Sequence, residues 1–279
     1  RRTAGKMAIP VAQIMPGAYS PDIPQAEAAT PLGICGLLLP DTAHQYQDNW
    51  EILGRDSQMV MVMVPPGQEM TLQPGAMVHA DRGLETEVTT GGCCDCAKRA
   101  AFAGEDMFRL HFINKTEVPQ AMSITPPFPG KVVPVDLARY SGIVCNVGAF
   151  FAGIGRDFRF QVRIVRSLGQ MLSMGNLFIV SITGSQMIFL AAGGTIMQKF
   201  LAPGEEYIIA SDAFLCAEAS VTLGIQKTGG CGVMCCGGEG FVNTKLTGPG
   251  MIMFQSMDCH KAAMNYVTVN QGGNGGGGG

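Results

Sequence analysis

The stretch PGQEMTLQPGAMVHA, residues 66–80, decides the fold because it returns in register as PGEEYIIASDAFLCA, residues 203–217. Each copy opens on Pro-Gly, passes a glutamate (Glu69 or Glu206), and continues through a strand-like run into a short apolar segment. Pro-Gly is typical of a tight turn, because proline presets one φ angle and glycine accepts a positive one. A repeat punctuated by such turns predicts β units that stack on one another.

A second element also recurs along the chain. LFIVSITGSQMIFL (177–190) aligns with FVNTKLTGPGMIMF (241–254), and MFRLHFIN (107–114) is a looser copy. A third Pro-Gly element, PGKVVPV (129–135), reaches GAFFAG (148–153) only after an insertion of ten residues. We therefore expect each unit to hold a hairpin turned at Thr-Gly or Asn-Lys, a Pro-Gly turn, and a second hairpin turned near Ala-Phe.

Between the turns, apolar and polar residues alternate with a period of two, as half-buried strands require. The segment 157–165 places aromatic and aliphatic residues on one face and arginine and glutamine on the other, and segments 108–112 and 221–225 alternate in the same way. The chain has 38 glycines, 16 prolines and no convincing stripe of helical period. It is predicted to be all-β, with repeated units of antiparallel strands and little helix.

The repeat also sets the expected domain boundaries. Residues 1–49, with scattered prolines, are predicted to be an extended arm or linker, 50–270 the duplicated all-β domain, and 271–279 a flexible glycine-rich tail. The domain starts with the second half of a unit (50–92) and ends with a first half (237–269). We therefore expect its two ends to complete one another and to close the sheets on themselves.

Composition narrows the function classes. The 279-residue chain is 47% hydrophobic with a net charge of -3, so it offers phosphates no basic stripe, and nucleic acid is not expected as a partner. The uncharged run from Ser167 to Gln198 is long enough to cross a bilayer, but its glycines predict turns between buried strands. The uneven spacing of ten cysteines favours a reducing compartment, and a start without methionine fits a cleaved organelle-targeting segment.

Two cysteine-rich loops are the candidates for metal chemistry. They occupy equivalent junctions of the repeat, and if the ends of the domain meet, six thiols come together; sets of four thiolates bind zinc or an iron–sulfur cluster. Neither loop has C-x-x-C spacing, so tolerated loop filling is the favoured interpretation, with metal binding and a disulfide or redox role as alternatives. The candidate ligands are Cys93, Cys94, Cys96, Cys231, Cys235 and Cys236.

The uncharged stretch GIVCNVGAFFAGIG (142–155) is interpreted as a loop inserted between elements that are tightly joined in the other copies. It can contact a neighbouring subunit or lipid, or plug the end of a barrel. The insertion favours a subunit contact, so Phe150 and Phe151 are predicted to form an oligomer contact.

The remaining candidate residues are interpreted as structural. His79 and His111 lie in strand-like segments and are predicted to be satisfied structural residues rather than ligands. Met59, Met61 and Met63 alternate along one strand, which indicates core filling in preference to an adaptable interaction surface. No G-x-S-x-G motif supports a nucleophilic triad.

Several motifs occur in order between Trp50 and Val269: WEILGRDSQMVMVMVPPGQEMTLQPGAMVHAD, GEDMF, TPPFPGKVVPVDL, GAFFAG, LAPGEEYIIA and GGEGFVNTKLTGPGMIMFQS. Together they resemble the family named for altered inheritance of mitochondria, number 24, whose fold is similar to that of the tryptophan RNA-binding attenuator protein. The resemblance implies an all-β fold of duplicated double-stranded β-helix or barrel-like units. It also implies homo-oligomers, often trimers, and in eukaryotes an organelle protein that influences inner-membrane organisation and respiratory complexes. It implies no catalytic residues, and the cysteine run departs from the family's glycine-rich loop.

Two functional hypotheses follow. The first is a non-enzymatic structural or scaffold protein, associated with the mitochondrial inner membrane or else in a plastid. It would act as a homo-oligomer, expected to be a trimer, that contacts other organelle proteins or a membrane surface and carries no cofactor. The alternative is a small-ligand or metal-binding β-barrel module that uses the barrel interior or the cysteine loops. An enzyme of cupin type is disfavoured, because the clustered histidine and glutamate motif of cupins is absent.

Overall fold

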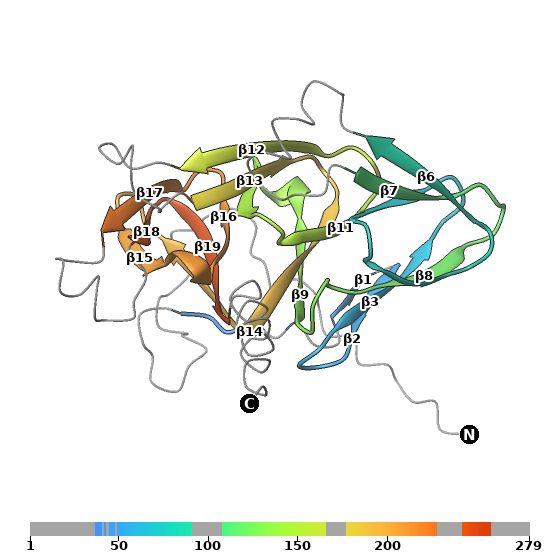
Figure 1. Ribbon diagram of the computed structural model, residues 1–279, viewed down its shortest axis with the longest axis horizontal. Helices are drawn as coiled ribbons and strands as arrows, with labels where there is room; N and C mark the ends of the chain where they lie inside the picture. Colours follow the sequence, from blue (N-terminus) through green and yellow to red (C-terminus); the bar gives the residue numbers. More distant parts are fainter. Residues whose placement is uncertain are drawn as a thin grey trace, which may run out of the picture.

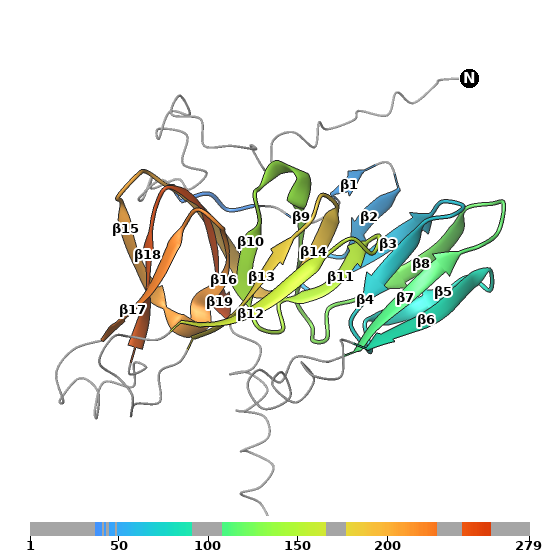
Figure 2. The same ribbon diagram turned by 90° about the horizontal axis from the view of Figure 1, so that it is seen from above.

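The computed structural model describes residues 37–40, 42, 45–47, 49–90, 108–165, 177–227 and 242–257. Within them the chain is almost entirely antiparallel β-structure (Figures 1 and 2). Helix is limited there to two short 3₁₀ turns, η3 (Leu137–Arg139) and η4 (Ser211–Ala213), and no helix in these ranges is long and apolar enough to span a membrane. The predicted all-β fold with little helix is confirmed.

The described residues form three units with the same order of strands. Unit 1 contains β3 (Met59–Val64), β4 (Glu69–Leu72), β5 (Met77–Ala80), β6 (Leu84–Thr90), β7 (Phe108–Asn114) and β8 (Gln120–Ile124). Unit 2 contains β9 (Lys131–Asp136), β10 (Ile143–Asn146), β11 (Phe150–Ile154), β12 (Arg159–Val165), β13 (Leu177–Thr183) and β14 (Met187–Leu201). Unit 3 contains the end of β14, then β15 (Glu206–Ala210), β16 (Phe214–Glu218), β17 (Thr222–Lys227), β18 (Val242–Thr247) and β19 (Gly250–Met257).

Each unit consists of two small sheets. The first, sixth and third strands pair in one sheet (β3·β8·β5, β9·β14·β11 and β14·β19·β16). The second, fifth and fourth strands pair in the other (β4·β7·β6, β10·β13·β12 and β15·β18·β17). The third strand carries a β-bulge at the same place in every unit, at Met77/His79, Phe150/Ala152 and Phe214/Cys216. This agreement establishes which residues are equivalent between units.

The Pro-Gly turns of the quoted repeat are structurally equivalent. The amide of Gln68 donates to the carbonyl of Pro65 at 3.1 Å, and the amide of Glu205 donates to the carbonyl of Ala202 at 3.0 Å. The glycines at the third position of these turns have positive φ angles, +74° at residue 67 and +78° at residue 204, as a type II turn requires. The predicted correspondence of residues 66–80 and 203–217 is confirmed.

The alignment of the third Pro-Gly element is wrong by one strand. Residues 131–136 form β9, the first strand of unit 2, whereas the other two Pro-Gly turns precede a second strand. The apparent insertion of ten residues therefore contains β10, which is the second strand, and 142–155 is not an inserted loop but β10, a turn and β11.

The two predicted hairpins are also incorrect. Thr183-Gly184 leads from β13 in one sheet to β14 in the facing sheet, and the segment after Leu72 leads from β4 to β5 in the same way; neither pair of strands is hydrogen-bonded together. Turn residues are the same for a hairpin and for a crossing between sheets, so the sequence does not distinguish them. Two facing sheets are what the double-stranded β-helix prediction requires.

Adjacent units are joined edge to edge. The third strand of each later unit pairs with the second strand of the unit before it, β11 with β4 and β16 with β10. The bulge residue of the later unit then packs in the core of the earlier one. Phe151 lies in the cluster of Trp50, Ile52 and other unit 1 residues, and Leu215 lies in the core of unit 2. Each of these two cores is therefore closed by the unit that follows it.

Strand β14 belongs to two units. Its first half pairs with β9 and β11 of unit 2, and its second half pairs with β19 of unit 3. The change of partner falls at Gly193 and Gly194, where the register shifts and Gly194 adopts a φ of +67°. These two glycines, expected to form a turn between strands, instead lie inside one long strand.

The expected closure of the sheets by the two ends of the domain is wrong. Units 1 and 3 lie on opposite sides of unit 2 in both ribbon views (Figures 1 and 2). Among the described residues, β5 ends the five-stranded sheet β1-β2-β3-β8-β5, and β15 ends the three-stranded sheet β15-β18-β17. Unit 1 thus has an open third strand and unit 3 an open second strand.

Part of the predicted N-terminal arm packs on the fold. Leu38 and Gln198 exchange two backbone hydrogen bonds of 2.8 and 2.9 Å, and β1 (Tyr46–Gln47) pairs with β2 (Trp50–Leu53), which pairs with β3. Residues 1–36 and the predicted tail, 271–279, lie outside the described residues.

Candidate interaction surfaces

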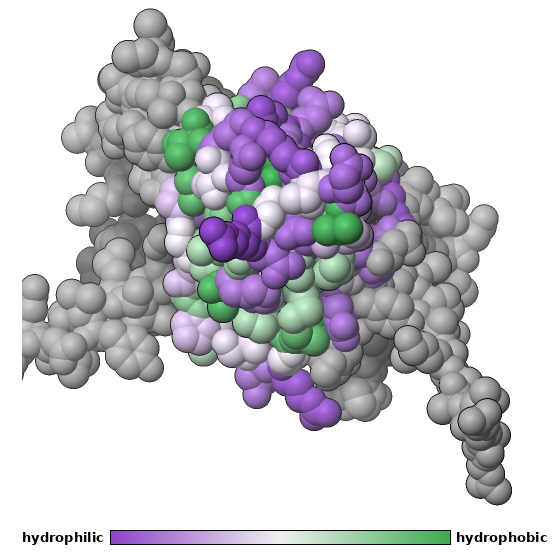
Figure 3. Space-filling model, turned by 90° about the vertical axis from the view of Figure 1, so that its right-hand side faces the viewer, coloured by the Kyte–Doolittle hydropathy of each residue, from purple (hydrophilic) through white to green (hydrophobic). Residues whose placement is uncertain are grey.

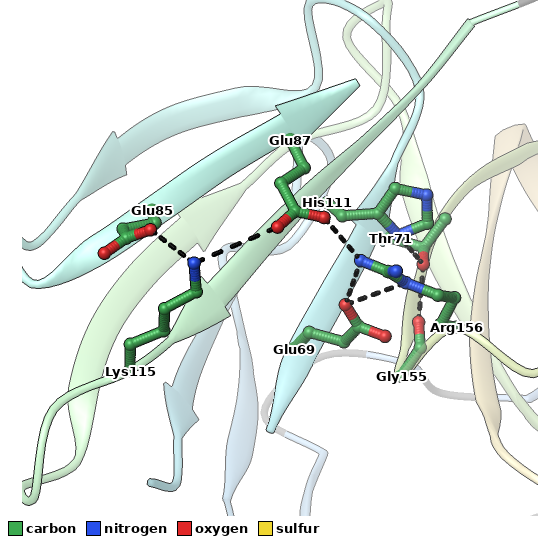
Figure 4. A network of polar contacts seen from close by, with 8 residues as sticks. All are labelled: Glu69, Thr71, Glu85, Glu87, His111, Lys115, Gly155 and Arg156. Atoms are coloured by element: carbon green, nitrogen blue, oxygen red, sulfur yellow. Dashed lines mark hydrogen bonds and ion pairs between the residues drawn. The ribbon is translucent and has the colours of Figure 1, made fainter. Parts of the chain in front are cut away.

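A network of ion pairs reinforces the joint between units 1 and 2 (Figure 4). Arg156 follows β11 and places Nη2 2.9 Å from Oε2 of Glu69 on β4 and 3.1 Å from Oε2 of Glu87 on β6. Lys115 continues the network, with Nζ 2.6 Å from Oε2 of Glu85. The hydrogen bond to Glu87 is the main reason that the pKa of Arg156 is raised. Because Arg156 and Glu87 are about half exposed, we expect their ion pair to contribute only about 0.2–1 kcal/mol.

A buried hydrogen-bond relay crosses the same joint beneath these ion pairs. Nδ1 of His111 on β7 lies 3.1 Å from Oγ1 of Thr71 on β4, and Thr71 donates its hydroxyl proton to the carbonyl of Gly155. A hydroxyl has one proton, so Nδ1 of His111 is the donor to Thr71. Burial, together with Arg156, lowers the pKa of His111 and favours its neutral form. The prediction that His111 is a satisfied structural residue is confirmed.

The hydrogen-bond relay does not place Thr71 and His111 as a catalytic pair. The proton of Thr71 points to a backbone carbonyl rather than to the imidazole, so the pair is not arranged as a nucleophile and its base. Over the ranges that the structure describes, no three histidine, cysteine, aspartate or glutamate residues are grouped so as to hold a metal ion. His79, on β5, is exposed.

The six candidate cysteine ligands lie outside the described residues. Their loops connect equivalent strands, β6 to β7 in unit 1 and β17 to β18 in unit 3. These strand pairs lie at opposite ends of the molecule (Figure 1), so the expected approach of the two loops through closure of the domain loses its basis. The residues concerned are Cys93, Cys94, Cys96, Cys231, Cys235 and Cys236.

Two further cysteines face each other across the second joint. Cys145 on β10 and Cys216 on β16 are register partners, both are present as thiols, and both are fully buried. Burial raises the pKa of the Cys216 thiol to about 12. A thiol held protonated in an apolar core is chemically inert.

Phe150 and Phe151 are buried inside the chain, with 1% and 0% of their surfaces exposed. Phe150 packs in the core of unit 2 and Phe151 in the core of unit 1. Phe151 therefore crosses a joint between units of one chain, Phe150 stays in the core of its own unit, and neither ring is available at the surface for a second subunit. A subunit contact made by these two residues stays a prediction that their burial does not support.

The open edges at the two ends of the molecule carry exposed apolar residues instead. Val78, the bulge residue of β5, is 49% exposed, and Ile208 on β15 is 48% exposed. Their equivalents at the joints within the chain, Phe151 and Val144, are 0% and 5% exposed. The residue types at the open edges are thus those that the chain buries where the same strands are paired.

The alternating methionines lie on β3, which strand β8 separates from the open edge strand β5 of unit 1. Met61 and Met63 on β3 are exposed, whereas the valines that alternate with them, Val60, Val62 and Val64, are buried. Figure 3 shows this end of the molecule, where apolar residues lie among polar ones. The core-filling interpretation is wrong for Met61 and Met63, and the alternative of an adaptable interaction surface fits their exposure.

The fold and these surfaces define a class of protein: an all-β repeat protein whose units are joined along strand edges and whose outer units, over the described residues, leave such edges unpaired. The chain belongs to the mitochondrial biogenesis AIM24 family, whose sequence pattern matches residues 50–257. This match confirms the resemblance inferred from the ordered motifs, and it ends where β19 ends.

A solved structure supports the fold. The X-ray crystal structure of a protein from Streptococcus pyogenes, determined by a structural genomics consortium, superposes with a TM-score of 0.62 and 21% sequence identity. The similarity covers 79% of this chain and 98% of that chain, and at this identity it shows the fold alone. No curated protein sequence matches the chain.

Proposed function

We propose that the protein is a non-enzymatic structural protein of the mitochondrion that works as a homo-oligomer and supports membrane or respiratory-complex organisation through protein contacts. Membership of a mitochondrial biogenesis family supports the organelle. One observation carries the proposal: the chain joins its own units along strand edges twice, and within the described ranges it leaves one edge of each kind unpaired with an exposed apolar residue. Open apolar edges of this kind are templates for pairing with another chain.

The mass of the purified full chain in solution tests the homo-oligomer. Light scattering at micromolar concentration is expected to give a multiple of 29.4 kDa. Ile208→Lys is expected to lower that mass, because it places a charge on the open edge of β15. Val118→Lys is the matched control, since Val118 is 58% exposed in the connection between β7 and β8 and lies on neither open edge. A single-chain mass for the unaltered protein would contradict the proposal.

Fractionation of cells tests the proposed location in the mitochondrion. The protein is expected in mitochondria, associated with the inner membrane, and chemical cross-linking in isolated mitochondria followed by mass spectrometry should link it to inner-membrane or respiratory-complex proteins. Ile208→Lys should weaken those links if they need the oligomer, and Val118→Lys should not. Recovery from plastids, or from the soluble fraction without such links, would overturn this part of the proposal.

A further inference from the structure

The two joints within the chain obey one register. In the first, Ala152, Gly153 and Ile154 of β11 face Leu72, Thr71 and Met70 of β4. In the second, Cys216, Ala217 and Glu218 of β16 face Cys145, Val144 and Ile143 of β10. Both joints continue one step beyond the strands with the same backbone hydrogen bond, from the amide of Gly155 to the carbonyl of Glu69 (2.7 Å) and from the amide of Ala219 to the carbonyl of Gly142 (2.9 Å).

The open edges hold the missing members of a third joint. On β5, the residues equivalent to Ala152, Gly153 and Ile154 are His79, Ala80 and Asp81, as fixed by the bulge and by the pairing with β8. On β15, the residues equivalent to Leu72, Thr71 and Met70 are Ile209, Ile208 and Tyr207, as fixed by the pairing with β18. The register of the two joints therefore predicts a single pairing of residues between these edges.

The residues around such a joint are complementary. The bulge residue, which is Phe151 or Leu215 within the chain, closes the core of the preceding unit. Its equivalent at the open edge, Val78, is exposed, and the described part of the chain contains no preceding unit for it to enter. Among the residues that the structure describes, no unit follows unit 3 to close its core, and Tyr207, Leu223 and Ile225 are only partly buried around it.

Charge at the end of the joint is also complementary. Arg156 lies one residue beyond Gly155 and pairs with Glu69 across the first joint. Arg82, exposed two residues after β5, is the equivalent of Gly155, and Glu206, which also pairs with Lys245 in its own chain, is the equivalent of Glu69. The third joint would therefore bring an arginine next to a glutamate, with the arginine one position earlier than Arg156 in the first joint.

We propose that β5 of one copy pairs antiparallel with β15 of a second copy in the register of the two internal joints, so that His79 faces Ile209, Ala80 faces Ile208 and Asp81 faces Tyr207. The inference rests on the homo-oligomer proposed above and specifies how it is built. The contact is heterologous, because it joins two different surfaces. A row of copies joined in this way therefore keeps one open β5 edge and one open β15 edge at its ends until a ring closes. Val78 of one copy then fills the open end of unit 3 in the next.

Disulfide cross-linking of the full chain tests this register. The predicted pair of His79 and Ile209 is equivalent to the native pair of Cys216 and Cys145, and it falls at a non-hydrogen-bonded position, where Cα atoms are about 4.5 Å apart and a disulfide is geometrically possible. The variant with both His79→Cys and Ile209→Cys should form dimers and larger species on a non-reducing denaturing gel. An equal mixture of the two single variants should form dimers only, with a peptide linking positions 79 and 209 identified by mass spectrometry.

Two controls make the result decisive. Each single variant by itself should show no cross-linking above that of the unaltered chain, and Val118→Cys combined with Ile209→Cys should behave like the single variants. Asp81→Cys combined with Tyr207→Cys is a second pair in the same register and replaces the first if Ile209→Cys fails to fold.

The outcomes separate this joint from the proposed function. Cross-links formed by His79→Cys alone would indicate pairing of β5 with β5 and overturn the head-to-tail joint. An oligomeric mass without a cross-link at either pair would overturn the joint and leave the homo-oligomer standing. A single-chain mass would overturn both.

Discussion

Replacing Phe151 with alanine is expected to lower the free energy of unfolding by about 3–5 kcal/mol, because this ring closes the core of a unit to which it does not belong. A buried aromatic ring removes about 150–250 Å² from water, which corresponds to about 4–6 kcal/mol at about 25 cal/mol per Å². Alanine keeps its Cβ buried, so part of this free energy is retained. The cavity left beside Phe189, whose ring centroid lies 6.4 Å from that of Phe151, destabilises the folded state further.

Urea unfolding followed by tryptophan fluorescence measures this loss at the right place. Trp50 is the single tryptophan, is 4% exposed, and packs at 5.4 Å from Phe189 in the same core. The urea concentration at the midpoint of unfolding should fall, while the slope of the unfolding free energy against urea concentration stays unchanged. Val78→Ala is the matched control at the equivalent, exposed position and should change stability by less than about 0.5 kcal/mol in dilute protein. A loss below about 1 kcal/mol for Phe151→Ala, or equal losses for both variants, would refute the reasoning.

Three further predictions concern the joints and turns. Because burial lowers the pKa of folded His111 below its ordinary value of 6.5, the unfolded chain takes up the proton first; stability should therefore fall as the pH drops through 6.5, and His111→Gln should flatten that fall in urea titrations. Arg156→Ala should cost roughly 1 kcal/mol, and a loss that does not shrink at high salt would contradict the exposed ion pairs as its cause. Gly204→Ala should cost about 1–2 kcal/mol through backbone strain alone, since φ is +78° and no atom lies within 4 Å of an added Cβ; an unchanged urea midpoint would contradict this.

The repeat could be predicted from sequence because its signals are local. Pro-Gly turns, the glutamate after them and the alternation of apolar residues lie within a few residues of one another, and the structure confirms them at residues 66–80 and 203–217. The pairing of strands is not local. A turn such as Thr183-Gly184 has the same residues whether the flanking strands pair or enter facing sheets, so the hairpins, the ten-residue insertion and the closure of the ends were predicted incorrectly.

The candidate surfaces illustrate the same limit. His111 was recognisable as structural because it lies in an apolar strand, but its partner Thr71 is 40 residues away in sequence, and Arg156 and Glu69 are 87 residues apart. Phe151 does lie at a contact between units, as an uncharged aromatic stretch indicates, yet the contact is within one chain. Only the strand order shows that Val78 and Ile208 occupy the same positions without a neighbour.

Strand β14 makes the chain unequally stiff. Its 15 residues extend for roughly 50 Å, and one continuous backbone carries both the last strand of unit 2 and the first strand of unit 3. We therefore expect these two units to move together. Unit 1 is connected to units 2 and 3 by a short segment and by the contacts of its joint. We therefore expect bending of the chain, and adjustment of curvature when copies assemble, to be greater at the joint that Arg156 and Phe151 fasten.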